Sequence, residues 1–148
     1  MKLEHGVSAA SDSFKDEPWN VVGHTYTPKI LSDNIFLWHA VLPAETFVPP
    51  HIHNSQDEWI HVLEGTLEVE FGGETHTAKA GDVVRMPQGE PHGIFNRSGA
   101  EAKAMFGVSP AGELFQLFQE LNGVTDPAEL VRLSAARDVD FLPPPDAA

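Results

Sequence analysis

The hydrophobic and polar positions along the chain divide it into three regions. Residues 1–20 are polar, with Ser, Asp and Lys clustered before Pro18, which predicts a flexible N-terminal arm. Between residues 21 and 108, short runs of Val, Ile, Phe, Trp and Thr alternate with breaks containing Gly, Pro or Asn, which predicts strands. The clearest predicted strands are Ile35–Leu42, Glu58–Leu63, Thr66–Phe71, Asp82–Met86 and Lys103–Val108. So many closely spaced strands indicate an all-β sandwich or barrel.

A helical pattern replaces the strand pattern after Val108. Ser109 is a candidate cap and Pro110 suits the first helical position. Apolar residues then recur three or four apart before Gly123, namely Leu114, Phe115, Phe118 and Leu121. This spacing predicts an amphipathic helix.

A second helix is predicted directly afterwards. Asp126 is its cap, Pro127 comes next, and Glu129 is placed to complete a capping box. The prolines of the tail FLPPPDAA stop any further helix. Residues 109–148 are therefore predicted to be a helical extension and tail after a barrel of residues 21–108.

Length, cysteine content and charge limit the classes of function. A chain of 148 residues fits one domain with a sizeable core, and the absence of cysteine excludes disulfides, thiolate metal ligands and a cysteine nucleophile. Nine Lys and Arg against 22 Asp and Glu give a net charge of −13, which would repel nucleic acid and an anionic membrane surface. The N-terminus lacks the apolar core of a signal peptide, and no run of about 18 apolar residues is present. A cytoplasmic protein is expected.

The segment HIHNSQDE, residues 51–58, carries three side chains of metal-ligand type. Side chains two apart in a strand share a face, so His51 and His53 point together, and Glu58 can join them once the chain has turned through residues 54–57. Imidazole and carboxylate suit Mn, Fe, Co, Ni, Cu or Zn. An isolated HxH also arises by chance near loops, where water satisfies surface histidines. For this segment alone, both interpretations stay open.

A second constellation follows in the segment GDVVRMPQGEPHGIFN, residues 81–96. An apolar strand ends there at Pro87, a turn at Gly89 reverses the chain, and His92 starts the next strand. Together the two segments resemble the two sequence motifs of the cupin superfamily. The matching residues are His51, His53, Glu58 and Gly65 in the first motif and Gly81, Pro87, Gly89, His92 and Asn96 in the second. Where the pattern prefers glycine this chain has Glu45, a departure that concerns the local turn rather than the ligands.

This resemblance covers roughly residues 20–108. It implies a double-stranded β-helix, the jelly-roll barrel of cupins, here followed by one or two α-helices. It also implies one divalent transition metal ion per chain, held by His51, His53, Glu58 and His92. The tail resembles that of small bacterial cupins described as quercetin-dioxygenase-like. The implied function is a metal-dependent dioxygenase that cleaves a small aromatic or enolic, flavonol-like substrate.

In such dioxygenases an enol or phenol oxygen binds the metal and the ligand glutamate accepts its proton, so Glu58 would play both parts. Four protein ligands leave one or two positions open on an ion that accepts five or six. Pocket residues must face into the barrel with the ligands, and Ile60, Val62 and Phe95 are the predicted set.

Two other functions compete with the dioxygenase. The same ion can serve a metal-dependent isomerase, decarboxylase or hydrolytic enzyme that consumes no oxygen. A non-catalytic cupin that binds a small molecule is the second alternative. In each case, exposed strand edges need covering, and the polar arm together with the apolar helices predicts a homodimer.

Overall fold

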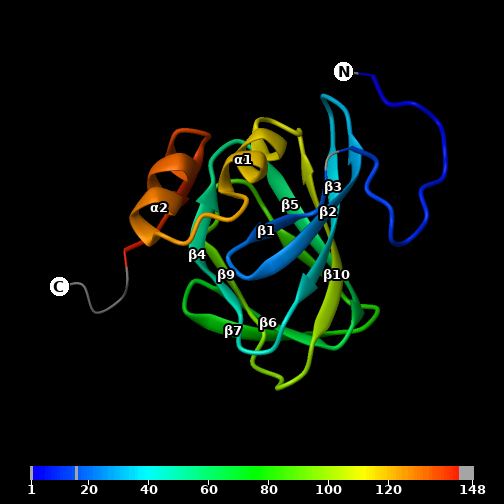
Figure 1. Cartoon of the computed structure of the whole chain (residues 1–148). Helices are drawn as coiled ribbons and strands as arrows, with labels where there is room; N and C mark the ends of the chain where they lie inside the picture. Colours follow the sequence, from blue (N-terminus) through cyan, green and yellow to red (C-terminus); the bar gives the residue numbers. More distant parts are fainter. Residues whose placement is uncertain (1, 16, 144–148) are drawn as a thin grey trace.

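Two antiparallel sheets form the body of the protein in the computed structural model, which describes residues 2–15 and 17–143. Figure 1 shows them as a barrel with both helices at one end. The strands are β1 (Trp19–Val21), β2 (His24–Leu31), β3 (Phe36–Leu42), β4 (Phe47–His53), β5 (Asp57–Glu64), β6 (Thr66–Phe71), β7 (Glu74–Lys79), β8 (Val83–Met86), β9 (His92–Phe95), β10 (Ala102–Ser109) and β11 (Val139–Phe141). The helices are α1 (Leu114–Leu121) and α2 (Pro127–Ala135). The predicted all-β fold, a double-stranded β-helix followed by two helices, is confirmed.

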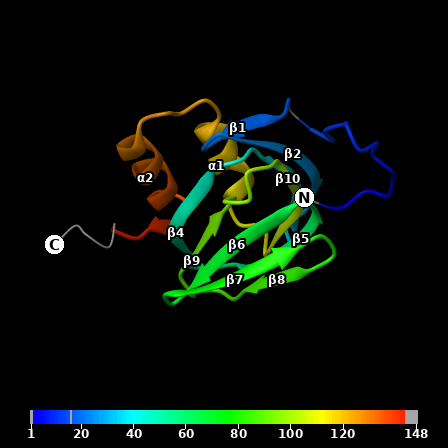
Figure 2. The ribbon, with the colours of Figure 1, turned by 90° about the horizontal axis from the view of Figure 1, so that it is seen from below.

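The order of strands in the two sheets sets β4 and β5 opposite each other. One sheet runs β1-β2-β3-β10-β5-β8 and the other runs β11-β4-β9-β6-β7. Consecutive strands β4 and β5 therefore belong to different sheets, and the turn at residues 54–56 carries the chain across the barrel. Figure 2 shows the two sheets from below, with α2 beside β4. Because of this crossing, side chains that are close in the sequence face each other from the two sheets.

The interior is filled by side chains that alternate along each strand. On β3 the inward residues are Phe36, Trp38, Ala40 and Leu42, each 2 % exposed or less. On β5 the inward residues are Glu58, Ile60 and Val62. A carboxylate therefore stands on the same buried strand face as two aliphatic residues. A buried charge of this kind needs partners in the interior.

Helix α1 begins at Leu114, four residues later than the predicted first helical residue, Pro110. Ser109 is the last residue of β10 and pairs with Asp57, so it cannot cap a helix, and the prediction that the helix starts at Pro110 is wrong. The chain first turns at Gly112, whose φ of 53° lies in the left-handed region. The predicted apolar stripe is confirmed, because Leu114, Phe115, Phe118 and Leu121 are all buried.

The stripe of α1 packs on aromatic residues of the first three strands. The Phe118 ring lies 5.0 Å from the rings of both Tyr26 and Trp38, measured between centroids, and the Phe115 ring lies 5.1 Å from that of Trp19. Such aromatic contacts bury large apolar areas. Helix α1 therefore closes one end of the barrel.

Helix α2 begins as predicted, and the chain after it returns to the barrel. Asp126 accepts a hydrogen bond from the backbone N–H of Ala128, and Pro127 occupies the first turn. The Glu129 carboxylate binds Arg132 rather than completing a capping box. Strand β11 then pairs with β4, and Phe141 stands opposite His51. The predicted tail beyond residue 143 lies outside the described residues.

Lys29 on β2 links the segment before β1 to the body of the protein. The Lys29 ammonium donates hydrogen bonds to the carbonyls of Ala9 at 2.8 Å and Ala10 at 3.0 Å. In Figure 1 the segment before β1 runs beside β2 and β3. Strands β1, β8, β11 and β7 are the sheet edges among the described residues, and the homodimer remains a prediction. No helix in residues 2–15 and 17–143 is long and apolar enough to span a membrane.

Candidate metal centre

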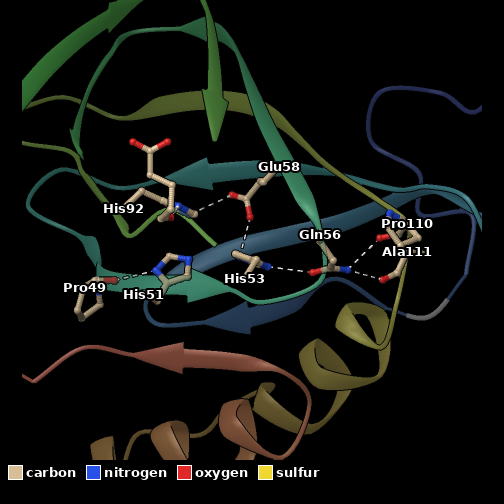
Figure 3. Close-up of polar contacts among 9 residues, drawn as sticks. Pro49, His51, His53, Gln56, Glu58, His92, Pro110 and Ala111 are labelled. Atoms are coloured by element: carbon tan, nitrogen blue, oxygen red, sulfur yellow. Dashed lines mark hydrogen bonds and ion pairs between the residues drawn. The ribbon is translucent and has the colours of Figure 1, made fainter. Parts of the chain in front are cut away.

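Four residues from three strands converge inside the barrel. His51 and His53 alternate on β4, Glu58 is the second residue of β5, and His92 begins β9. In the sheet His51 pairs directly with His92, and the turn after β4 brings Glu58 across from the facing sheet. One potential ligand atom from each residue lies within 4.8 Å of the others, and all four side chains are buried. Figure 3 shows them pointing toward one another.

Each imidazole is oriented by a hydrogen bond at Nδ1. His51 Nδ1 lies 2.8 Å from the Pro49 carbonyl oxygen, and His92 Nδ1 lies 3.1 Å from that of Glu90. Carbonyl oxygens only accept, so each of these nitrogens carries the proton. The Nε2 lone pairs of both rings are therefore free for the centre of the cluster. Such outer hydrogen bonds are the usual support of metal-ligating histidines.

Gln56 orients the third imidazole. Its Nε2 donates to the carbonyls of Pro110 at 3.1 Å and Ala111 at 2.7 Å, which fixes the amide so that Oε1 faces His53. Oε1 accepts from His53 Nδ1 at 2.9 Å. All three histidines thus present Nε2 inward. Figure 3 shows the contacts that run from His53 through Gln56 to the carbonyls of Pro110 and Ala111. Gln56 also ties the ligand cluster to the loop before α1.

Charges inside the cluster stabilise a proton between His53 and Glu58. Burial alone would raise the pKa of Glu58, but His53 and its contact with the carboxylate at 2.7 Å hold that pKa well below its usual range. Burial opposes a charge on His53 too, yet the carboxylate raises its pKa. Burial and repulsion from the neighbouring imidazoles lower the pKa of His51 to about 3, and burial lowers that of His92. Without a bound cation, this contact therefore favours an imidazolium on His53 beside an ionised Glu58.

The donor set fits a divalent transition metal ion. Ligand atoms about 2.1 Å from one ion lie at most about 4.2 Å apart, so the four atoms need to close in by less than about 1 Å. His92 Nε2 is buried without a hydrogen-bond partner among the described residues, and the nearer Glu58 oxygen is 3.9 Å away. Three imidazoles and a carboxylate suit Mn, Fe, Co, Ni, Cu or Zn. A cation would take the place of the proton between His53 and Glu58 and give His92 Nε2 a partner.

Motif residues that are not ligands hold the backbone around the cluster. The Gly89 N–H donates to the His53 carbonyl at 2.9 Å and so joins the turn before β9 to the end of β4. Asn96 is fully buried, and its Nδ2 donates to the carbonyls of Leu42 at 2.9 Å and Ala100 at 2.8 Å. Glu45, where the cupin pattern prefers glycine, has a φ of 64°. The chain therefore keeps the left-handed turn there with a residue that favours it less.

A cavity adjoins the cluster. It is small, with about 50 Å³ open to water-sized molecules, and His51, His53 and Glu58 line it together with mainly apolar side chains. One wall comes from the barrel, with Tyr26, Trp38 and Ile94 among its residues. The other comes from the C-terminal extension, with Leu117, Ser134 and Phe141 among its residues. Phe141 packs on His51 with 5.3 Å between ring centroids. The extension therefore roofs the centre.

The three predicted pocket residues lie elsewhere. Ile60 and Val62 share the face of Glu58, but they are fully buried in the barrel core and do not line this cavity. Phe95 is out of phase with the inward residues His92 and Ile94, and its ring stacks on Phe47 outside the cavity with 5.8 Å between centroids. Strand alternation explains the result for Phe95. His61, predicted to lie opposite the ligand face, is exposed.

Three buried residues in or near the site carried no sequence signal. Gln56 lies between His53 and Glu58 in the sequence, and this location was the one feature that could have identified it as part of the site. His24 had no neighbouring signal, yet it is fully buried and joins Tyr26 to Thr46, with contacts of 3.2 Å and 2.9 Å. Ser134 sits in a short helix far from either motif. Its role depends on where that helix packs.

A comparison with protein families supports the same conclusion as the fold. The family model described as a cupin domain matches residues 38–108. These residues form a cupin domain. All four clustered residues lie within it, whereas α1, α2 and β11 lie outside it. The roof of the cavity is therefore an addition to the cupin domain.

Known relatives agree with this assignment. The chain is 31 % identical over 75 residues to the tetracenomycin polyketide synthase protein TcmJ of Streptomyces glaucescens, which is 51 % of this chain and 50 % of that protein. It is 28 % identical over 81 residues to the pectin degradation protein KdgF of Dickeya dadantii, covering 53 % and 74 %. The chain thus spans about half the length of TcmJ.

Solved structures show the same fold. An RmlC-like cupin from Shewanella frigidimarina superposes with a TM-score of 0.67 at 19 % identity, over 78 % of this chain and 99 % of that one. At this identity the likeness shows the cupin fold alone.

Proposed function

We propose that this cupin is a mononuclear metal enzyme acting on a small aromatic or enolic molecule, with oxygen-dependent cleavage of a ring or C–C bond as its reaction. The observation that carries the proposal is the placement of Glu58 and two imidazoles in the wall of a mainly apolar cavity. A substrate that fills the cavity would meet the ligand cluster directly. A flavonol-like substrate is the finer form of the proposal, supported by the likeness of the tail to quercetin-dioxygenase-like cupins.

His51, His53, His92 and Glu58 would hold the ion, which when bound supplies a Lewis acid and redox chemistry toward dioxygen. Glu58 is the carboxylate of the cluster, and a bound cation would keep it ionised at neutral pH. It can therefore accept the proton of a substrate hydroxyl. The hydrogen bonds at Nδ1 hold the imidazole rings in one orientation throughout. The apolar wall excludes bulk water, which strengthens the electrostatic contacts inside.

The relatives favour a small-molecule substrate. TcmJ takes its name from polyketide synthesis and KdgF from pectin degradation. Polyketide chains carry ketones that enolise readily, which agrees with a base that removes a proton from oxygen. The match spans half of TcmJ, so its name supports only the class of substrate proposed here, a small enolic molecule.

The metal content of three proteins tests the ligand assignment. Wild type should hold about one transition metal ion per chain, measured by elemental analysis after purification without a histidine tag. Replacement of both His51 and His53 by alanine should abolish binding, because two of four ligands are lost. The control is His61→Ala, which removes an exposed imidazole from the other face of β5. Full occupancy in the double variant would contradict the ligand set.

Oxygen uptake tests the reaction. Wild type should consume oxygen with quercetin or with the smaller enol acetylacetone, followed with an oxygen electrode. Glu58→Gln keeps the size of the side chain and leaves three imidazoles, so it should retain much of the metal but lower turnover by about a hundredfold or more. Near-normal turnover in that variant would remove the proton-transfer role. Turnover without oxygen uptake would refute the cleavage reaction and leave a metal-dependent isomerase or decarboxylase.

A further inference from the structure

Two buried polar atoms in the cavity wall have no hydrogen-bond partner among the described residues. They are the indole nitrogen Nε1 of Trp38 on β3 and the hydroxyl of Ser134 on α2. Trp38 is 2 % exposed and Ser134 is 0 % exposed, and both residues line the cavity beside the ligand cluster. The two residues come from opposite walls, one in the cupin domain and the other in the extension.

Such atoms are unusual inside a protein. Leaving a buried donor or acceptor unpaired costs about 1–3 kcal/mol, so most are paired. A helical serine commonly bonds the carbonyl four residues earlier, yet the Ser134 hydroxyl makes no such bond. Both residues line the cavity, so a molecule inside it can pair with these atoms once neighbouring side chains move aside. The only other unpaired atom of this kind in the described residues is His92 Nε2, in the ligand cluster itself.

The chemistry of these two groups defines the molecule that they suit. An indole N–H only donates, so the partner of Trp38 must be an acceptor. A hydroxyl can donate or accept, so Ser134 also suits an oxygen atom. The remaining wall is mainly aliphatic and aromatic, with Ile94, Leu117 and Val139 among its residues. A matching ligand has a compact apolar body with a carbonyl-type oxygen.

We propose that the cavity is a recognition site for keto-substituted aromatic molecules, in which Trp38 Nε1 and the Ser134 hydroxyl hydrogen-bond to ligand oxygen. This inference rests on the proposed function, because it names the class of substrate that the centre receives. The barrel and the C-terminal extension would then select the substrate jointly. Trp38 and Ser134 are thus specificity-determining residues, separate from the four ligands of the ion.

A matched pair of probes tests the inference on the full chain. Acetophenone carries a carbonyl group, and ethylbenzene has nearly the same shape without it. Dissociation constants are measured by NMR on ¹⁵N-labelled protein, both as purified and after treatment with EDTA. Wild type should bind acetophenone about 3- to 10-fold more tightly than ethylbenzene, the value of one neutral hydrogen bond. One of the three indole N–H signals, assigned to Trp38 through Trp38→Phe, should shift with acetophenone only.

Three variants assign the preference to its residues. Trp38→Phe should abolish most of the preference for acetophenone, because phenylalanine keeps an aromatic ring but has no donor. Ser134→Ala should lower the preference while keeping the packing of α2. The control is Trp59→Phe, which makes the same substitution at a tryptophan outside the cavity and should leave the preference unchanged. If Trp38→Phe does not fold, Ser134→Ala decides the question together with the Trp38 signal of wild type, which is then assigned by elimination with Trp19→Phe and Trp59→Phe.

Equal affinity of wild type for the two probes would overturn the inference, and it would mean that water satisfies both groups. An unchanged preference in both cavity variants would overturn it as well, as would failure of both probes to bind. These outcomes are distinguishable from failure of the proposed enzyme. Failure of the proposed enzyme would appear as missing metal in elemental analysis or as missing oxygen uptake. The ratio of the two affinities does not depend on these results, because it is also measured on protein treated with EDTA. Both cavity variants should retain the wild-type metal content.

Discussion

Replacement of Gln56 by leucine tests whether this residue holds the ligand cluster in place. Gln56 is 5 % exposed, and its amide joins His53 Nδ1 to the carbonyls of Pro110 and Ala111. Leucine is similar in size but makes none of these three hydrogen bonds. The His53 ring then loses the acceptor that fixes its orientation, and the loop before α1 loses its tie to the barrel.

The magnitude follows from the groups left without partners. One N–H and two carbonyl groups lose a hydrogen bond, and each unsatisfied buried group costs about 1–3 kcal/mol. Water can reach part of this loop, so the low end applies and the free energy of unfolding should fall by about 3 kcal/mol. Loss of the partner of a ligating histidine lowers metal affinity about 10- to 100-fold. Both effects should therefore appear in the same variant.

Two measurements separate these effects. Urea denaturation in the presence of EDTA gives the free energy of unfolding without metal, and competition with a chromophoric chelator gives metal affinity. The control is Gln88→Leu, an exposed residue whose side-chain amide donates to the Asn54 carbonyl in the β4–β5 turn at 2.8 Å. That variant should change stability by less than about 0.5 kcal/mol. Metal affinity within twofold of wild type in Gln56→Leu would refute the role of Gln56.

Two further substitutions test the packing and the electrostatics of the barrel. In Gly107→Ala the new Cβ would meet the Trp59 ring at 2.2 Å, so thermal denaturation should show a loss of about 1–3 kcal/mol, while Gly6→Ala, with open space around it, should be neutral. A neutral Gly107→Ala would mean that the indole moves freely. Burial lowers the pKa of His24 from 6.5 to about 4, so the unfolded chain takes up this proton first as the pH falls. Its contribution is fully present above pH 6.5, and about 2 to 3 kcal/mol should be lost between pH 7 and 4.5. His24→Gln should lack this part of the loss in urea denaturation, and an unchanged pH dependence would show that His24 is not held neutral.

The sequence alone predicted the type of fold and the four residues that the structure brings together in one cluster. The period of two along a strand is a local property of the backbone, so it put His51 and His53 on one face without knowledge of the rest of the chain. The same period put His61 on the opposite face, where it is exposed. The predicted strands match observed ones to within one residue at each end, and the apolar stripe of α1 followed from the period of a helix.

Only the tertiary structure decided what surrounds the ligands. The local sequence around Ser109 predicts a helix cap, but Ser109 pairs with Asp57 in the sheet, and this pairing overrides the local preference. Ile60 and Glu58 share a strand face, yet only Glu58 reaches the cavity, because α1, α2 and β11 roof one part of the barrel. Trp38 and Ser134 meet the same cavity from segments far apart in the sequence. Contacts of this kind depend on how distant elements pack, and the local pattern of hydrophobic and polar residues does not specify that packing.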